Sequence, residues 1–186
     1  MSKPVSALGG VSHKGFATVT EAGLKGMITV RGDLGSGAMK KAVKAAAGTA
    51  VPGPRRIEIA GDRAAAWMSP DELLVLVPYG AAQDTVAALE QALAGSHHLV
   101  ADVSDARAVF TIAGRQADQV LMKLCPADVA LLEPGDIRRT RAAQVAAAFW
   151  KSGPEEFTLV SFRSVAGYVM GLLEVASRPG AELFPA

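Results

Sequence analysis

The sequence predicts an α+β protein made of two similar units, and two pairs of matching segments support this. Met27–Gly32 and Val109–Gly114 are both short alternating runs that end in glycine, 82 positions apart (27 to 109). Pro70–Leu76 and Pro154–Val160 both follow an alanine-rich run, 84 positions apart (70 to 154). These nearly equal offsets indicate an internal repeat, and the repeated order of elements is β-α-β-β-β-α. Consecutive strands in this order pair as antiparallel hairpins, with the helices packed on one face of each sheet.

The first unit begins with a strand at 27–31 and a helix for which Ser36 is the expected N-cap. That helix has apolar residues at the spacing i, i+3, i+4, i+7, namely Met39, Ala42, Val43 and Ala46. Pro52-Gly53-Pro54 follows it and breaks the helical pattern. Three strands are expected next, near 56–59, 64–67 and 72–77. A second helix is expected at about 82–94, where one face carries Val86, Leu89 and Leu93.

The second unit follows the same order from a strand at 108–112. Its first helix carries an apolar stripe at helical spacing, made of Ala117, Val120, Leu121 and Leu124. Strands are expected near 138–142, 146–150 and 157–162. The last helix is expected to be capped by Ser164 and to end before Pro179-Gly180. Trp67 and Trp150 take equivalent places in the two units, which predicts a packing role for both.

These elements predict an N-terminal arm at 1–25, units at 26–96 and 97–176, and a C-terminal tail at 177–186. Each unit has about 75 residues, a size at which a single core is marginal, so we expect the two to pack against each other. The arm and the tail show no periodic pattern. Such segments are often ordered only when a partner binds them.

Composition and charge exclude several classes of function. The chain has 19 Lys+Arg against 18 Asp+Glu and a formal net charge of +1. It therefore lacks the electrostatic footprint of a nucleic-acid or anionic-membrane binder. No apolar run approaches the roughly 20 residues that span a bilayer, and the first ten residues contain no apolar signal segment. The sequence predicts a cytoplasmic protein whose partners are proteins or small molecules, not nucleic acid or membrane.

Reactive side chains are scarce, and none forms a recognisable catalytic set. The glycine-rich stretch 32–37 matches neither phosphate-loop pattern, which predicts a flexible turn before a capped helix. His97 and His98 are adjacent at the start of a strand, so they point to opposite faces and do not readily share a metal ion. Cys125 has no histidine after it in the chain, which favours a buried apolar role over a nucleophile. The sequence thus assigns no residue a catalytic, cofactor-binding or metal-binding role.

Two places are candidates for contact with a protein partner. Arg139 and Arg141 alternate on a strand and project to one face, where a solvated surface and a salt-bridged interface are both open. Leu183 and Phe184 are apolar residues in the terminal segment. We therefore predict these four residues as the candidate partner interface.

Several segments of the chain together carry a family resemblance. Asp102-Val103-Ser104, followed by 108–114 and 117–124, resembles the start of the folate-dependent aminomethyltransferases, which include the glycine-cleavage T-protein. The segments 65–76, 139–140 and 157–168 are similar to the gamma subunit of heterotetrameric sarcosine oxidase. The resemblance runs in order from about Met27 to Ala176.

This resemblance implies an aminomethyltransferase-like fold and a complex that oxidises sarcosine to glycine. Such a complex reduces oxygen to hydrogen peroxide and passes the one-carbon unit to tetrahydrofolate. The resemblance further implies that FAD, FMN, NAD and tetrahydrofolate belong to the other subunits. The alpha, beta and delta subunits are then the partners, and the present chain is a non-catalytic assembly subunit.

The chain also departs from the catalytic aminomethyltransferases. It is too short for their full architecture, and no glycine-rich segment with a substrate-handling aspartate follows the first helix of the second unit. No folate-binding or catalytic residue is therefore carried over. Two alternatives stay open, a subunit of a related N-methyl amino acid oxidase or dehydrogenase, and a stand-alone folate-binding protein of one-carbon transfer.

Overall fold

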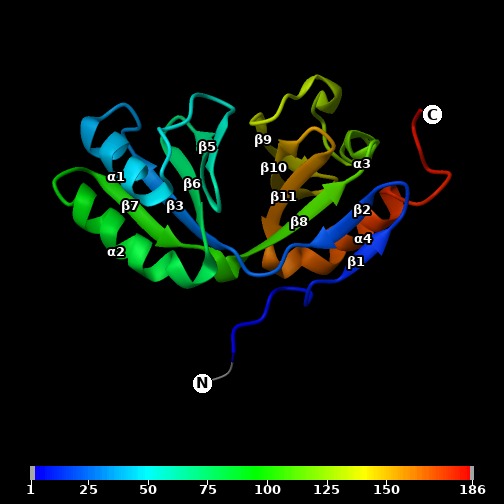
Figure 1. The fold of residues 1–186 in the computed structure, drawn as a ribbon, viewed down its shortest axis with the longest axis horizontal. Helices are drawn as coiled ribbons and strands as arrows, with labels where there is room; N and C mark the ends of the chain where they lie inside the picture. Colours follow the sequence, from blue (N-terminus) through cyan, green and yellow to red (C-terminus); the bar gives the residue numbers. More distant parts are fainter. Residues whose placement is uncertain (1–2, 185–186) are drawn as a thin grey trace. The chain divides into compact units, whose positions relative to one another are not determined.

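The computed structural model describes residues 3–184, and its contacts divide the chain into two compact units (Figure 1). The middle unit is Lys25–Asp105. The terminal unit combines the described residues before Lys25 with those after Asp105. Each unit is an antiparallel sheet with two α-helices, so the predicted α+β class is confirmed.

The middle unit has a five-stranded sheet in the order β4-β5-β6-β3-β7, in which every pair is antiparallel. Its strands are β3 (Gly26–Gly32), β4 (Ile57–Ala60), β5 (Arg63–Ser69), β6 (Glu72–Val77) and β7 (His98–Asp102). Its helices are α1 (Gly37–Ala47) and α2 (Ala82–Leu93), with a short 3-10 turn, η1 (Tyr79–Ala81), before α2; another turn, η2 (Ser104–Ala106), follows β7 and runs into the terminal unit.

Helix α1 forms as the sequence predicts. The Ser36 hydroxyl accepts a hydrogen bond from the Met39 backbone N–H at 3.2 Å, which satisfies one of the unpaired amides at the helix start. Gly48 ends the helix in the left-handed conformation, with φ of 70°. The predicted stripe is buried, and it packs with Leu89 and Leu93 of α2 against Val30, Leu73 and Val75 of the sheet.

The terminal unit has a six-stranded antiparallel sheet in the order β1-β2-β8-β11-β10-β9. Its strands are β1 (Ser12–Lys14), β2 (Thr18–Glu21), β8 (Arg107–Ala113), β9 (Ile137–Ala142), β10 (Val145–Gly153) and β11 (Glu156–Phe162). Its helices are α3 (Ala117–Leu124) and α4 (Ala166–Ala176), with 3-10 turns η3 (Val129–Leu131) and η4 (Arg163–Val165).

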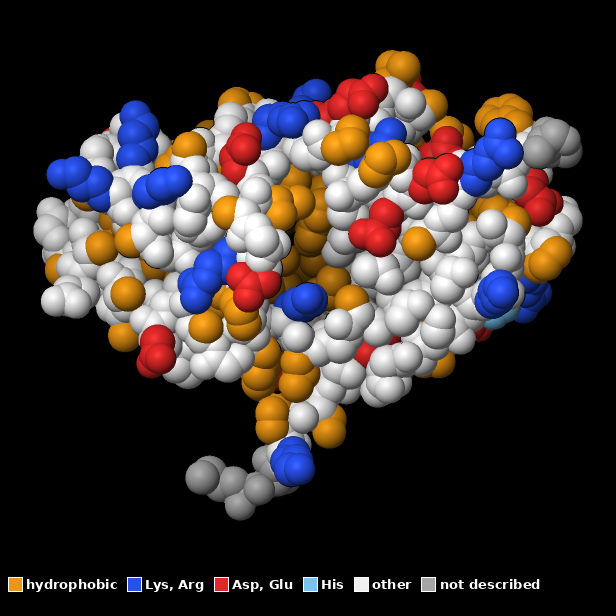
Figure 2. Space-filling view, in the orientation of Figure 1, with side chains coloured by type: hydrophobic (Ala, Val, Ile, Leu, Met, Phe, Trp, Pro, Cys, Tyr) orange, Lys and Arg blue, Asp and Glu red, His pale blue; other side chains and the backbone are white. Residues whose placement is uncertain are grey.

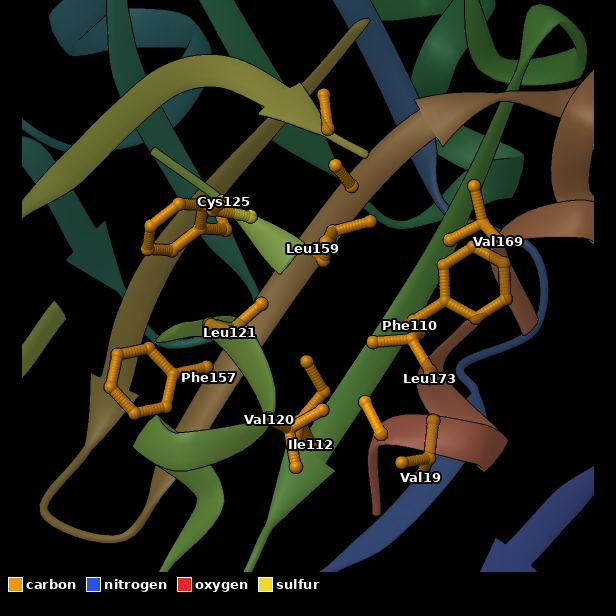
Figure 3. Close-up of a cluster of buried hydrophobic side chains, with 14 of the residues drawn as sticks. Val19, Phe110, Ile112, Val120, Leu121, Cys125, Phe157, Leu159, Val169 and Leu173 are labelled. Atoms are coloured by element: carbon orange, nitrogen blue, oxygen red, sulfur yellow. The ribbon is translucent and has the colours of Figure 1, made fainter. Parts of the chain in front are cut away.

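The core of the terminal unit lies between its two helices and one face of its sheet (Figure 3). Val120 and Leu121 of α3 and Val169 of α4 pack there with Phe110 and Leu159. Each of these five side chains is fully buried. At about 25 cal/mol per Å² of apolar surface, such side chains supply most of the stabilisation that opposes chain entropy.

Two features of the predicted second unit differ in detail. Ser164 does not cap the last helix, because the chain first forms η4, and α4 begins at Ala166 after Val165 without a side-chain cap. The two tryptophans are also not equivalent. Trp67 pairs with Leu73 and is half-buried, whereas Trp150 pairs with Thr158 and is buried. Thr158 corresponds to Leu74, which pairs with Ala66, so Trp150 corresponds to Ala66 and not to Trp67.

The unit boundaries also differ from the predicted ones at 25/26 and 96/97. The segment predicted as an N-terminal arm contains β1 and β2, and β2 pairs with β8 through contacts such as Val19 with Ile112. The strand at 98–102 belongs to the middle unit, because Val100 pairs with Val30 of β3. The second boundary therefore falls after Asp105. These pairings join segments far apart in sequence, which local patterns do not reveal.

The order strand, helix, three strands, helix occurs in each unit, as β3-α1-β4-β5-β6-α2 and as β8-α3-β9-β10-β11-α4. Among residues 3–184, none of the helices combines the length and the apolar character needed to cross a bilayer.

Candidate interaction surfaces

Arg139 and Arg141 lie on β9, the strand at one edge of the six-stranded sheet, and both are exposed. Between and beside them, Arg138 and Thr140 are half-buried, as the alternation of a strand requires. The Arg138 guanidinium donates to the backbone carbonyl of Ile137 at 2.8 Å. The predicted alternation is therefore present, with two cationic side chains on the exposed side.

The side chains of Leu183 and Phe184 are 43% and 65% exposed, but the backbone beneath them is held in place. Both residues donate their backbone N–H to Oε1 of Gln119, at 2.7 Å and 3.1 Å. In return, Nε2 of Gln119 donates to the Phe184 carbonyl at 3.2 Å, and Nε2 of Gln116 donates to it at 3.1 Å. The tail thus presents two apolar side chains on a backbone that α3 fixes.

Sequence reasoning missed Gln119, which is buried to 6% exposure within α3. Its neighbours Ala117, Val120 and Leu121 form the apolar stripe, and a glutamine beside such a stripe gives no signal of its own. Its role depends on where the tail runs, so only the folded chain reveals it.

Lys123, one turn further along α3, ties three segments together. Its ammonium donates to the carbonyls of Ala176, at the end of α4, and of Ala181, in the tail. It also lies 4.8 Å above the ring of Phe16. Burial lowers the pKa of Lys123 below its usual value, against the opposing effect of Glu182. Segments predicted to be loose without a partner are therefore held within the terminal unit itself.

An apolar groove of about 670 Å³ lies beside this cluster, between α3 and α4. Its wall includes Leu124, Gly171 and Leu172, and Tyr168 and Val175 stand at its edge with 48% and 53% exposure. The exposed side of α4 is thus more apolar than that of an ordinary surface helix.

The middle unit has a pocket of about 650 Å³, and the glycine-rich stretch and the histidine pair discussed in the sequence analysis both line it. It is lined by the glycine-rich turn before α1, the histidine pair and the turn between β5 and β6, through Gly32, Asp33, Ser36, Asp71, His97 and His98. Arg31 also lines it, and the Arg31 guanidinium lies 2.6 Å from the Glu72 carboxylate and 3.8 Å from that of Asp71. Of the charged side chains that line this pocket, Arg31 and Asp71 therefore lie close to each other.

His97 and His98 differ in their surroundings. His97 is exposed, while His98 is half-buried between two acceptors. Its Nδ1 lies 2.9 Å from the Ser96 carbonyl and its Nε2 lies 3.0 Å from the Glu90 carboxylate. Because both neighbours only accept, both hydrogen bonds form only when both ring nitrogens carry protons. The Ser96 carbonyl and the Glu90 carboxylate accordingly raise the pKa of His98.

Cys125 is buried at 5% exposure in the core of the terminal unit, as predicted (Figure 3). Burial raises the pKa of its thiol to about 12. A thiol of that pKa carries almost no thiolate at neutral pH, so it packs as a small apolar group. Among the described residues, no cluster of three or more His, Cys, Asp or Glu side chains could hold a metal ion.

On the face shown in Figure 2, basic and acidic side chains are interspersed. This agrees with the formal net charge of +1. Four surfaces of the chain are suited to contact with another molecule. They are the fixed C-terminal tail with its exposed Leu183 and Phe184, the edge strand β9 with its exposed arginines, the apolar groove between α3 and α4, and the polar pocket of the middle unit.

The fold is that of the aminomethyltransferases. Over 83% of this chain and 44% of that chain, the structure matches aminomethyltransferase T of the glycine cleavage system from Bartonella henselae, with a TM-score of 0.64. The sequences are 16% identical, so this match shows the fold alone.

Within that class, the chain belongs to the sarcosine oxidase gamma subunit family. The model of that family matches residues 31–179. The chain is 32% identical over 157 residues to sarcosine oxidase subunit gamma from Arthrobacter sp, covering 82% of this chain and 72% of that protein. It is 30% identical over 189 residues to the subunit from Corynebacterium sp. (strain P-1), covering 95% and 87%. The predicted family resemblance is confirmed.

A solved structure agrees with the sequence relatives. A chain of the heterotetrameric sarcosine oxidase from Corynebacterium sp. U-96, in complex with pyrrole 2-carboxylate, matches with a TM-score of 0.77 and 26% identity. The match covers 87% of this chain and 83% of that chain. Both units of the present chain are therefore needed to account for the similarity.

Proposed function

We propose that this chain is a non-catalytic accessory subunit of a heterotetrameric sarcosine oxidase. The observation that carries the proposal is the match to a chain of such an oxidase over 87% of this chain and 83% of that one. Because a shared fold alone does not imply a shared function, the proposal also rests on the 32% and 30% identity to subunits named sarcosine oxidase subunit gamma. The alpha, beta and delta subunits are the partners, and the complex works in the cytoplasm.

In this proposal the chemistry takes place in the other subunits. They bind FAD, FMN, NAD and tetrahydrofolate, oxidise sarcosine to glycine with formation of hydrogen peroxide, and transfer the one-carbon unit. The present chain contributes docking surfaces. Its one cysteine has a pKa of about 12, and the carboxylates of Asp71 and Glu72 are paired with Arg31, which supports a role other than nucleophilic or acid–base catalysis.

The exposed residues Arg139, Arg141, Leu183 and Phe184 are proposed as parts of the partner interface. The fixed tail backbone supports this for Leu183 and Phe184, because a held segment loses little conformational freedom when a partner covers it. The fully buried centre of a protein interface is more apolar than its rim and is enriched in aromatic side chains, which suits Phe184 in particular. The two arginines on the edge of the sheet suit the polar rim.

We also infer that the two units are copies of one repeated unit. The bulge between Trp67 and Ser69 on β5 has a counterpart between Lys151 and Gly153 on β10, 84 positions later (67 to 151, 69 to 153). The central pairing of Met27 with Leu76 has its counterpart in Val109 with Val160, at offsets of 82 and 84. Matching registers and a matching bulge support descent from one supersecondary unit.

The function is tested by co-expressing the tagged chain with the alpha, beta and delta subunits of its own organism. We expect all four to purify together, and titration of the isolated chain with tetrahydrofolate to give no heat of binding. A chain that purifies alone contradicts the proposal. Micromolar binding of tetrahydrofolate to the isolated chain would instead favour the independent folate-binding protein.

The arginine part of the interface has a matched test. We expect the double variant Arg139→Glu/Arg141→Glu to bind the remaining subunits at least tenfold more weakly, with a smaller dependence of the association rate on salt. Lys40→Glu/Lys41→Glu makes the same change of charge on the exposed side of α1 and serves as the control. Equal affinities of the two double variants would remove Arg139 and Arg141 from the interface.

A further inference from the structure

We propose that the outer edge of β7 in the middle unit, together with the pocket at its start, binds an extended segment of another subunit of the oxidase. The segment pairs with β7 as an added antiparallel strand. This inference rests on the proposed function, since it names the kind of contact that the accessory subunit makes.

β7 is the last strand of the five-stranded sheet (Figure 1). It pairs with β3 on its inner side only, and among residues 3–184 no strand pairs with its outer side. The Val103 N–H donates to the Met27 carbonyl at 2.8 Å, so the backbone groups of every second residue before Val103, namely Ala101 and Leu99, face β3. In an antiparallel pair alternate residues face the partner, so the backbone groups of Val100 and Asp102 point outward.

The terminal unit shows what such an edge accepts. Ile28 of β3 pairs with Asp102, and Phe110, 82 positions after Ile28, pairs with Glu21 of β2. β2 in the six-stranded sheet therefore corresponds to β7 in the five-stranded sheet. In this correspondence Glu21 matches Asp102 and Val19 matches Val100.

On β2, these outward positions are occupied by the chain's own N-terminal segment. Val19 pairs with His13 of β1, and the Glu21 N–H donates to the Val11 carbonyl at 2.9 Å. The added strand is antiparallel and short. The terminal sheet thus has six strands where the middle sheet has five, and the difference is the strand on this edge.

The edge of β7 also lacks the protection that free edges carry. Charged side chains, above all lysine, and very short strands keep exposed edges from pairing. β9 carries three arginines, and β1 has three residues that include Lys14. β7 has five residues, and its second residue, Leu99, is apolar and 49% exposed.

The polar residues at the two ends of β7 are directed to the strand's own unit. His98 lies against the Glu90 carboxylate of α2 at 3.0 Å. Asp102 accepts from Nε2 of Gln83 at 2.7 Å and from the Ser104 hydroxyl at 2.5 Å. Neither side chain therefore guards the middle of the strand, where an approaching backbone would pair.

The pocket at the start of β7 indicates which side chain the segment carries. It is lined by Leu99 and Met39 as well as by polar groups, and its Arg31 is paired with Asp71 and Glu72. In the terminal unit, Gly15 and Phe16 stand in the places of Ser96 and His97, 81 positions earlier (96 to 15, 97 to 16). There the space is taken by the chain itself, because the Phe16 N–H donates to the Ser177 carbonyl and Lys123 covers the Phe16 ring. Leu99 and Met39 give this pocket an apolar part, which suits an uncharged apolar side chain.

The test places a photo-crosslinking amino acid at Leu99 in the co-expressed four-subunit oxidase, and at Ile59 as the matched control. Ile59 is 50% exposed and lies on β4, at the opposite edge of the same sheet. We expect position 99 to form an adduct with one contiguous segment of another subunit, and position 59 to form none with that segment. In the same oxidase, Leu99→Lys should weaken binding of this chain at least tenfold, against less than twofold for Ile59→Lys.

The outcomes separate this inference from the proposed function. An assembled oxidase in which position 99 forms no adduct overturns the docking site and leaves the proposed function intact. An adduct between two copies of this chain overturns the choice of occupant. Failure of the wild-type chain to join the other subunits overturns the proposed function, and the docking site with it. Equal thermal unfolding of Leu99→Lys and Ile59→Lys shows that weakened binding is not caused by misfolding.

Discussion

The buried amide of Gln119 is expected to control whether the C-terminal tail stays attached to α3. The informative change is Gln119→Leu, which keeps a side chain of similar size and good helix propensity but removes the amide. The wild-type side chain makes three hydrogen bonds to the backbone of Leu183 and Phe184. At about 1 kcal/mol each, their loss weakens attachment of the tail by about 3 kcal/mol, a factor on the order of 100 in the opening equilibrium.

Hydrogen–deuterium exchange with mass spectrometry measures this directly. We expect peptides that contain Leu183 and Phe184 to exchange up to about 100-fold faster in Gln119→Leu, while peptides of β8 and β11 keep their wild-type protection. Gln116→Leu is the matched control, because Gln116 makes one hydrogen bond to the same tail. It should accelerate exchange only about fivefold.

Two results would refute this reasoning. Unchanged exchange of the tail in Gln119→Leu would mean that the hydrogen bonds to Gln119 do not hold it. Equal acceleration in the tail and in the central strands would mean that the substitution destabilises the whole unit. If the tail alone is released, affinity for the other subunits should fall as well, because part of the binding free energy would then be used to order Leu183 and Phe184.

Three further predictions concern groups whose surroundings the structure defines. The neighbours of His98 raise its pKa above 6.5, so its stabilising contribution is complete below about pH 6.5 and is lost as the pH rises through the folded-state pKa; an NMR titration that gives a pKa below 6.5 contradicts this. Replacing His98 by Gln should remove that pH dependence from urea unfolding curves. Cys125, with a pKa of about 12, should react with a thiol reagent at pH 8 at least about 100-fold more slowly in the folded chain than in urea, and equal rates would show that it is not buried. Ser36→Ala should lower the free energy of unfolding by about 1 kcal/mol through loss of the cap on α1, and an unchanged urea midpoint would contradict the cap.

The sequence predicted the elements that local patterns specify. The stripe of α1, its cap at Ser36 and the order of strands and helices follow from spacing and turn chemistry, and all are present in the structure. The pairing of β7 with β3 and of β2 with β8 was missed, because each joins segments that are distant along the chain. Strand propensity says that a segment is extended, but not which edge it joins.

The residues of the candidate interface could be predicted from their type and from strand alternation, but the contacts that hold the tail in place could not. Exposed arginines on a strand follow from alternation, so Arg139 and Arg141 could be identified. The hold of Gln119 and Lys123 on the tail could not, because it depends on the path of residues 177–184 across α3. The family was predicted from segments in order along the chain, a signal that does not require knowing which strands pair.

The central claim is that this chain acts as one subunit of a four-subunit oxidase, and native mass spectrometry tests it most directly. The oxidase would be expressed with all four chains and purified through a tag on the alpha subunit. The account predicts one intact mass equal to the sum of one alpha, one beta, one delta and one copy of this chain. An active oxidase whose mass lacks this chain, with the untagged chain left in the unbound fraction, would contradict it.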